Sequence, residues 1–287
     1  MGQVPNHIVS TLEPDIRRLY RILSQEAKYG HFVRIPRRIC RCLDHFKVPA
    51  HRAEIIERLH AYYLFIGVVD DLIDSTRIEA GSEILRQLTN RTIFFDSETM
   101  ESQAKLATEI LKTHIERHLY AEVIAKFEEL YLAVRRERGA ETLAAFIVER
   151  KAVGRLTAEL SYILISPLVE RDREDLCEFL MDVGEVGCLI DSVIDFRSDY
   201  EQGLLKFAPG VKDRFRLSVQ SLRGGIRLAS AHPGLLLSFL EAICDNVLDR
   251  VRSRAAAGFP ASVESVVRHE TGVVSSETLT AIAWIKP

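Results

Sequence analysis

The sequence predicts an all-α protein with a single domain, and three observations lead to this fold class. Apolar residues recur at intervals of three and four over 55–73, 146–163 and 176–190, which is the spacing of one face of an α-helix. No proline occurs between Pro49 and Pro167, and a proline inside a helix costs about 3 kcal/mol. The alternating apolar and polar pattern of surface strands is nearly absent.

About ten helices are expected, separated by clusters of glycine, proline and polar residues. The breaks are predicted near residues 28–36, 48–50, 75–81, 89–97, 136–139, 166–167, 203–210 and 232–234. The best strand candidate, residues 92–95, is short and falls within one of these breaks. After Pro260 the chain is polar and then apolar, which predicts either a final helix over the core or a frayed end.

Composition is that of an ordinary globular protein, and all of residues 1–287 are assigned to the one domain. Hydrophobic residues make up 47% and charged residues 28%, which excludes a disordered chain. A net charge of −3 argues against nucleic-acid binding. No run of 18 apolar residues is present, so no integral membrane segment is expected. Five scattered cysteines do not form a disulfide framework, which favours a cytoplasmic protein.

A first acidic cluster, Asp70, Asp71 and Asp74, ends an otherwise apolar predicted helix. Residues four apart lie on one helix face, so Asp70 and Asp74 are neighbours and Asp71 lies beside them. Three like charges on one turn repel each other, and a divalent cation that prefers oxygen ligands, such as Mg²⁺, would stabilise them. The alternative is an acidic helix end exposed to water, although the helix dipole opposes negative charge there.

A second acidic cluster, Asp191, Asp195 and Asp199, has spacings of four on another long helix. That helix is apolar nearly all round, which is typical of a buried helix, and buried carboxylates must be paired or coordinate metal. Residues too small to fill a core precede the cluster on the same stripe, and they are Gly184, Gly187 and Cys188. The sequence therefore predicts a carboxylate clamp above a cavity.

Arg150 and Lys151 lie between the two clusters in the sequence, within a third apolar helix. Arginine can hold an anion through its planar fork and lysine as a point charge. Gly154 follows in the interior of the same helix, where glycine costs about 1 kcal/mol relative to alanine. The approach of a ligand, a bend in the helix or close packing would each explain Gly154. The alternative for the whole segment is a basic face exposed on the surface.

Together the motifs DDLID, RKAVG and DSVIDFRSDYEQGLLKFAP resemble class I isoprenoid synthases, which comprise trans-prenyltransferases, squalene and phytoene synthases, and class I terpene cyclases. The resemblance covers roughly residues 55–209. DDLID matches the first aspartate-rich motif of the family in full. The second motif keeps the phytoene-synthase rhythm at Asp195, Asp199 and Gly203, and it equally overlays the three metal ligands of cyclases. Ser192 stands where elongating enzymes usually have a second adjacent aspartate.

The resemblance implies a helical bundle around a central apolar cavity, with both acidic clusters at its mouth. Three Mg²⁺ ions on the six aspartates would bind the diphosphate of an allylic prenyl substrate. Neutralisation of the leaving group is then expected from Arg150, Lys151, Arg197 and Lys206. The expected lining of the cavity, in which each residue is equally suited to an ordinary core, consists of Tyr63, Phe65, Ile66, Phe146, Gly184, Gly187 and Cys188.

The expected activity is that of a Mg²⁺-dependent terpene cyclase, because Arg150 and Gly154 resemble the diphosphate-sensing helix of cyclases. The glycine-lysine-arginine site for a second substrate is also not cleanly present. An aromatic content of 8% is low for a cyclase. The alternatives are a prenyltransferase of the squalene/phytoene or chain-elongating type, and a non-catalytic lipid-binding scaffold. The partner is a prenyl diphosphate, and a homodimer is compatible with the sequence.

Overall fold

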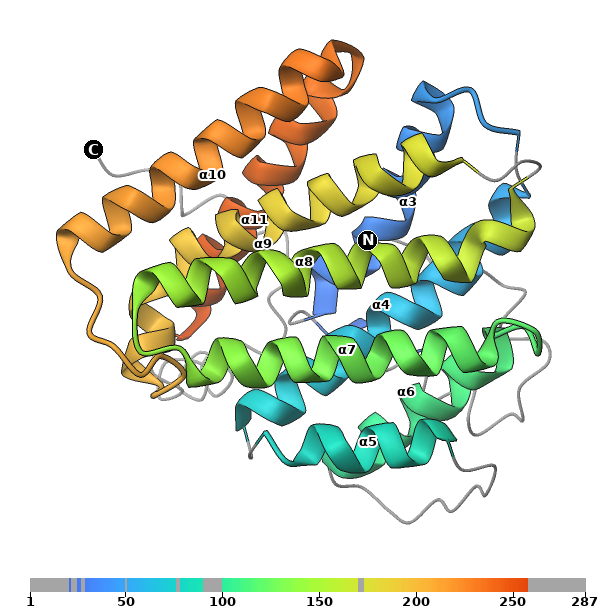
Figure 1. Ribbon diagram of the computed structural model, residues 1–287, viewed down its shortest axis with the longest axis horizontal. Helices are drawn as coiled ribbons and strands as arrows, with labels where there is room; N and C mark the ends of the chain where they lie inside the picture. The colour runs from blue at the N-terminus through green and yellow to red at the C-terminus, as the bar shows by residue number, and fades with distance from the viewer. Residues whose placement is uncertain are drawn as a thin grey trace, which may run out of the picture. The chain divides into compact units, whose positions relative to one another are not determined.

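The computed structural model contains only helices among the residues that it describes (Figure 1). The described residues are 21, 25–26, 29–49, 51–75, 78–89, 100–169 and 173–257. The all-α prediction is therefore confirmed for this part of the chain. The strand candidate at 92–95 and the segment after Pro260 lie outside it. The chain divides into two compact units, Met1–Ile243 and Cys244–Pro287, and the single-domain assignment stays a prediction.

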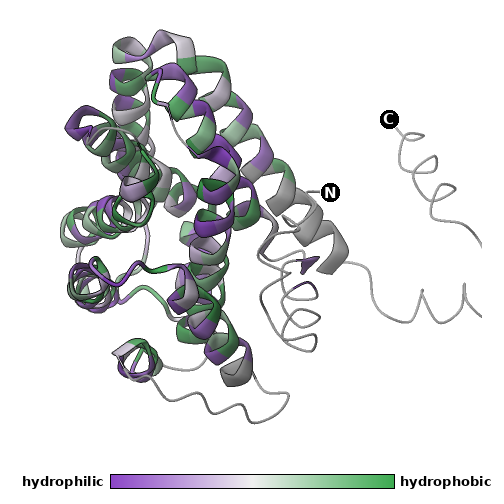
Figure 2. Ribbon diagram, turned by 90° about the vertical axis from the view of Figure 1, so that its right-hand side faces the viewer, coloured by the Kyte–Doolittle hydropathy of each residue, from purple (hydrophilic) through white to green (hydrophobic). Residues whose placement is uncertain are grey.

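Nine α-helices and two short 3₁₀-helices are described. They are α3 (Gly30–His45), α4 (Arg52–Ser75), α5 (Ala80–Thr89), α6 (Met100–His114), α7 (Tyr120–Gly139), α8 (Leu143–Ile165), η2 (Ser166–Leu168), α9 (Glu174–Glu201), α10 (Val211–Ala231), η3 (Pro233–Leu235) and α11 (Leu236–Ala257). Among the described helices, none combines the length and hydropathy that crossing a membrane requires. Figure 2 shows hydrophobic and hydrophilic residues interleaved along the helices, as expected when each buries one side.

The ends of the helices fall close to the predicted breaks and have local causes. α8 begins where the Thr142 hydroxyl accepts a hydrogen bond from the Ala145 N–H at 3.2 Å, an N-cap. The same helix stops before Pro167, which cannot continue an α-helical hydrogen-bond ladder. α9 stops before Gly203, whose φ of +74° lies in the left-handed region that favours glycine.

Two boundaries differ from the prediction. α3 begins at Gly30 and runs through Pro36, so the first break is shorter than expected. The proline removes one helical hydrogen bond, and the burial of its ring in the core offsets this loss. The break at 115–119, between α6 and α7, was not predicted because it contains neither glycine nor proline. There the buried Arg58 of α4 donates a hydrogen bond to Glu116 at 2.9 Å, which anchors the connection.

Consecutive helices pack against one another from α7 through α8 and α9 to α10, while α4 packs on α3, α6 and α8 (Figure 1). α8 and α9 approach most closely at Gly154 and Gly184. A Cβ on Gly154 would lie 2.3 Å from the Gly184 carbonyl oxygen, and one on Gly184 would lie 2.3 Å from that of Gly154. The missing side chains therefore allow the two backbones to touch, and α8 continues unbroken through this point.

Two hydrophobic clusters form the core of the first unit. The larger one is built mainly from α3, α4, α6, α7, α8 and the first half of α9. The smaller one lies where the start of α8 meets the second half of α9 and α10, and its buried members are Ala140, Leu143, Phe146, Leu189, Phe196, Leu205 and Leu217. The second half of α9, which carries the acidic residues, is thus anchored by Phe196 and Leu189 on its other side.

Candidate functional site

The last turns of α4 and the second half of α9 bring aspartates of the two clusters within electrostatic range of each other. The pKa of Asp70 is raised from 3.8 to about 7; burial by surrounding protein is the largest cause, and the charge of Asp74 is the next. Asp191, on α9, also raises the pKa of Asp70. The negative charge on α9 therefore raises the pKa of a carboxyl group at the end of α4.

The same coupling acts in the other direction. The pKa of Asp199 is raised to about 7, with burial as the largest cause. The negative charges of Asp195, Asp191 and Asp74 of α4 also raise it, in decreasing order. Burial likewise raises the pKa of Asp74, which the ion pair with Arg138 only partly opposes. Carboxyl groups of the two sequence clusters thus influence one another's pKa values.

Asp70 combines an accessible side chain with a raised pKa. The side chain is exposed to solvent, although the surrounding protein desolvates it enough to raise its pKa. Solvent and small solutes can therefore reach this carboxyl.

Two arginines enter the acidic region from α7 and α8. Arg150 donates hydrogen bonds to Asp191 at 3.2 Å, to Glu137 at 3.3 Å and to the Cys188 carbonyl oxygen at 3.3 Å. Its positive charge lowers the pKa values of Asp70, Asp74 and Asp199, opposing their burial. Arg138 forms an ion pair with Asp74. The carboxylates outnumber these two cations, so the region retains negative charge.

Asp71 makes a different contact from its neighbours. Its Oδ2 accepts a hydrogen bond from the hydroxyl of Tyr29, at 3.1 Å, and Tyr29 is buried just before α3. Asp71 still contributes to the raised pKa of Asp74, so it lies within range of the cluster. One oxygen of Asp71 thus ties α4 to the start of α3.

The other cations predicted for the site are engaged elsewhere or exposed. Lys151 forms an ion pair with Glu185 at 2.9 Å. Arg197 is 78% exposed and pairs with Glu201 on its own helix. Lys206 is exposed in the connection after α9 and forms no ion pair with a described residue. Arg150 is the predicted cation that the structure brings to the aspartates.

The residues expected to line a cavity have different surroundings. Tyr63 and Phe65 are buried, and the Tyr63 hydroxyl donates to Ser161 at 3.3 Å. Phe146 packs in the smaller core cluster, with ring centroids 6.1 Å from Phe196. Ile66, Gly184 and Cys188 are half-buried, with Gly184 against Gly154.

Gly187 is the member of this set that faces open space. It is exposed, and a Cβ placed on it would meet no atom within 4 Å. It lies one turn before Asp191 on the same stripe of α9. The small side chain therefore leaves room beside the second acidic cluster, as its position in the sequence predicts.

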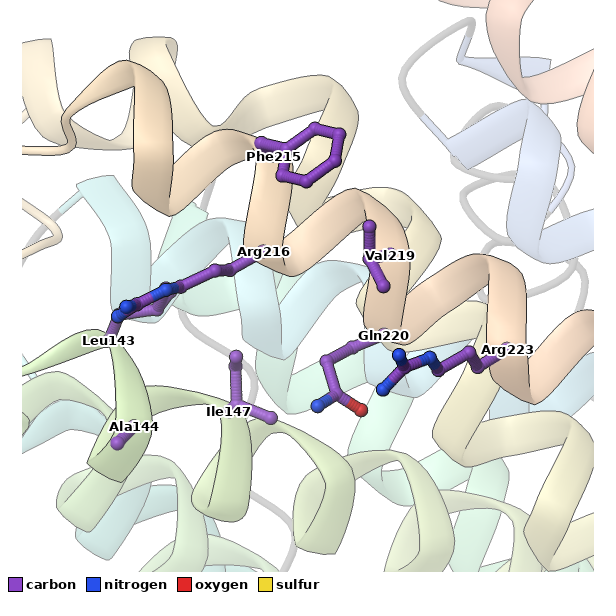
Figure 3. Close-up of a pocket in the computed structure, with 8 residues that line it drawn as sticks. All are labelled: Leu143, Ala144, Ile147, Phe215, Arg216, Val219, Gln220 and Arg223. Carbon is purple, nitrogen blue, oxygen red and sulfur yellow. The ribbon is translucent and has the colours of Figure 1, made fainter.

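A pocket of about 480 Å³ lies elsewhere, between the start of α8 and α10 (Figure 3). Its lining residues are Leu143, Ala144, Ile147, Phe215, Arg216, Val219, Gln220 and Arg223. None of these was predicted for the substrate cavity. The central apolar cavity between the acidic clusters stays a prediction.

The donor chemistry of the acidic region suits a hard divalent cation. Among the described residues, no three or more His, Cys, Asp or Glu side chains are gathered tightly enough to hold a metal ion. Burial is the largest cause of the raised pKa values of Asp70 and Asp199, and neighbouring carboxylates add to it, while the charge of Arg150 opposes the rise in part. Carboxylate oxygens with uncompensated charge are the ligands that Mg²⁺ accepts, so the residues fit this ion by chemistry.

Sequence reasoning missed three residues of this region: Arg138, Glu137 and Tyr29. Arg138 and Glu137 stand in the charged run at the end of α7, which resembles an ordinary solvated helix end. Tyr29 precedes α3 and is far from Asp71 in the sequence, so no spacing rule connects them. A pattern search along one helix finds carboxylates that share a face, but it does not find partners from other helices.

Comparisons with protein-family models, with curated proteins and with solved structures find no match to this chain. The family membership suggested by the sequence motifs therefore stays a prediction.

Proposed function

We propose that the protein is a Mg²⁺-dependent class I terpene synthase that ionises an allylic prenyl diphosphate. The observation that carries the proposal is the approach of two aspartate clusters from different helices, with Arg150 beside them. Excess carboxylate next to a partly buried arginine suits a ligand that brings both cations and a polyanion. A magnesium diphosphate has this composition.

The chain's own residues would bind and orient the diphosphate. Bound Mg²⁺ would supply positive charge that neutralises the aspartates and the oxygens of the leaving group. Arg150 presents a planar fork that matches phosphate oxygens, and it would turn part of its bonding from Asp191 to the ligand. Breaking the allylic C–O bond then leaves diphosphate, stabilised by Arg150, and a carbocation on the hydrocarbon chain.

The carbocation would need an apolar, water-poor surface beside the aspartates. Gly187 leaves space on α9 next to Asp191, Cys188 is half-buried beside it, and Ile66 lies one turn before Asp70 on α4. These residues can contact the hydrocarbon end while the diphosphate stays at the carboxylates. Product size would follow from the depth of this space.

A prenyltransferase of the squalene/phytoene type is the second candidate, and Gly203 favours it. This glycine ends α9 in the left-handed conformation, four residues after Asp199, as the D-x-x-x-D-x-x-x-G rhythm requires. A non-catalytic lipid-binding scaffold is the third candidate. The density of repelling carboxylates argues against it, since such repulsion destabilises a fold without serving packing.

The test is turnover of geranyl, farnesyl and geranylgeranyl diphosphate with Mg²⁺, each with and without isopentenyl diphosphate. Pyrophosphate release and gas chromatography–mass spectrometry report the reaction. A cyclic hydrocarbon or alcohol from one substrate alone supports the proposal. A longer diphosphate that forms only with isopentenyl diphosphate, or a doubled hydrocarbon, identifies a prenyltransferase instead.

The assignment of the aspartates is tested by Asp70→Ala and Asp195→Ala. Each should lower turnover by at least 1,000-fold, because each removes part of the charge that holds the magnesium diphosphate. Asp182→Ala, on the same helix α9 but paired with Arg155, is the matched control and should keep turnover within about threefold of the native protein. Full activity of both site variants would exclude the clamp.

A further inference from the structure

Helix α10 carries an apolar stripe on the side that faces away from the core. Its buried face is formed by Leu217, Ser221 and Leu228. A second set of apolar residues is spaced at four, seven and four, with side chains between 56% and 89% exposed, and it consists of Val211, Phe215, Leu222 and Ile226. At 100° per residue these four share one stripe on the opposite side of the helix. Packing within the first unit gives no reason for this stripe.

A basic stripe runs beside the apolar one. Each of the four exposed apolar residues is followed directly by a cation, and these are Lys212, Arg216, Arg223 and Arg227. With Arg214 the helix has five basic residues and one acidic residue, in a chain whose net charge is −3. Positive charge is therefore concentrated on this helix, against the balance of the whole chain.

Most of these cations have no ion-pair partner in the described part of the chain, where Lys212, Arg214, Arg216 and Arg223 form none. Arg227 pairs with Asp182 at 3.3 Å. By contrast, the arginines of α8 that face α9, such as Arg150 and Arg155, each contact two or more carboxylates. Unpaired cations next to exposed apolar side chains are complementary to a surface that presents anions above hydrocarbon.

The pocket between α8 and α10 adds a place for an anionic head group. Its floor comes from the first turns of α8, including Ile147, while Arg216 and Arg223 extend over it from α10 (Figure 3). Phe215 also borders the pocket and points away from α8 in Figure 3. The Arg216 guanidinium lies beside Leu143 and that of Arg223 beside Gln220, so an anionic head group at either arginine would lie beside apolar side chains of the pocket (Figure 3).

We propose that α10 docks this protein on an anionic lipid bilayer, lying in the interface with its apolar stripe inserted and its basic stripe on the phosphates. Helices with this pattern lie flat at the headgroup boundary and do not span the membrane. Long basic side chains can reach the phosphates while neighbouring apolar residues insert. The proposal is independent of the proposed catalytic activity, because no residue of the acidic region takes part.

The experiment measures co-sedimentation of the full chain with two kinds of vesicle. One consists of phosphatidylcholine, and the other of equal parts phosphatidylcholine and phosphatidylglycerol. We expect binding to the anionic vesicles that falls at least tenfold in 0.5 M NaCl, and little binding to the neutral ones. Failure to bind anionic vesicles at low salt would overturn the proposal.

Two double variants test the basic stripe and the apolar stripe separately. Arg216→Gln with Arg223→Gln should weaken binding about 25-fold, since each cation near an anionic surface contributes about a factor of five. Phe215→Ser with Leu222→Ser should weaken it at least tenfold by removing the inserted side chains. The matched controls are exposed residues of other helices, namely Leu132→Ser with Val148→Ser and Arg86→Gln with Arg135→Gln, and they should bind like the native chain.

Circular dichroism should show native helicity for all four double variants, because every substituted side chain is exposed. Equal binding by the α10 variants and the native chain would overturn the proposal. So would concentration-dependent self-association that the Phe215→Ser and Leu222→Ser pair abolishes without any vesicle binding, since the stripe would then cover a second copy. Only selective loss in the α10 variants supports the lipid surface.

Discussion

The helix pair α8 and α9 carries two charge networks of opposite character. In one, Arg155 of α8 contacts Asp182 at 2.9 Å and Glu178 at 3.2 Å, and Lys151 pairs with Glu185 nearby. In the other, Arg150 contacts Asp191 and Glu137. In the Arg155 network, cations of α8 pair with carboxylates of α9. In the Arg150 network, carboxylates outnumber the cations.

The difference shows how the same helix pair can serve packing and a ligand. Raised carboxyl pKa values occur in the Arg150 network, at Asp70, Asp74 and Asp199, and each has burial as its first cause. Ion pairs at a surface contribute little, so the Arg155 network fixes the helix register at low cost. The Arg150 network retains an excess of carboxylates. Their negative charge is unfavourable in the free protein and would attract a bound cation.

Replacing the central arginine of each network should give the largest difference in the free energy of unfolding. Arg150→Met should lower the free energy of unfolding by about 3 kcal/mol at pH 8, because Glu137 and Asp191 lose their partner. Arg155→Met, the matched control, should cost less than about 1 kcal/mol because Arg155 is more exposed than Arg150 and its partner Glu178 is largely exposed. Urea denaturation followed by circular dichroism measures both, and equal losses would contradict the distinction between the networks.

The close contact of α8 and α9 at Gly154 can be tested by adding a methyl group to this glycine. Gly154→Ala should destabilise the protein by about 2 kcal/mol, since its Cβ would lie 2.3 Å from a backbone oxygen of α9 and the helices must move apart. Gly187→Ala, also within a helix but in open space, should gain up to about 1 kcal/mol from helix propensity. Thermal unfolding compares them, and two changes of the same sign would disprove the contact.

The smallest effect concerns the pH dependence of the acidic region. The pKa of Asp70 rises from 3.8 unfolded to about 7 folded, so its ionisation weakens the fold as the pH rises between these values. Asp70→Asn should therefore raise stability by about 1 kcal/mol at pH 8, allowing for solvent screening, and change nothing at pH 3. Chemical denaturation across this pH range measures the difference.

Asp175→Asn is the control of opposite sign. The hydrogen bond from Arg173 lowers the pKa of Asp175, so its charge stabilises the fold above the unfolded pKa. The variant should lose stability at pH 8 and should match the native chain well below pH 4. If Asp70→Asn also lost stability at pH 8, the excess of negative charge would be wrongly assigned.

Helix boundaries and the shared faces of the aspartates could be predicted from the sequence because both depend on local spacing. Pro167 and Gly203 end their helices by chemistry that a single residue carries. The end of α6 could not be predicted, since residues 115–119 contain neither glycine nor proline. The contact made there, from Arg58 of α4 to Glu116, joins residues far apart in the sequence and has no local signal.

The site was predictable in part for the same reason. The position of Arg150 between two acidic motifs made it a candidate, and in the structure it donates a hydrogen bond to Asp191. Lys151, the next residue, turns to Glu185, because adjacent helical residues point about 100° apart. The close approach of Gly154 to Gly184 was one of several readings of a mid-helix glycine, and only the structure distinguishes packing from ligand contact.

The sequential packing of α7, α8, α9 and α10 has a consequence for the order of folding. Each helix finds its partner in the next one along the chain, so these contacts close short loops and can form rapidly. The aspartates of α4 meet those of α9 only when segments far apart in the sequence are joined, which closes a much longer loop. We therefore expect the mutual repulsion of the carboxylates to arise after the α7–α10 contacts have formed.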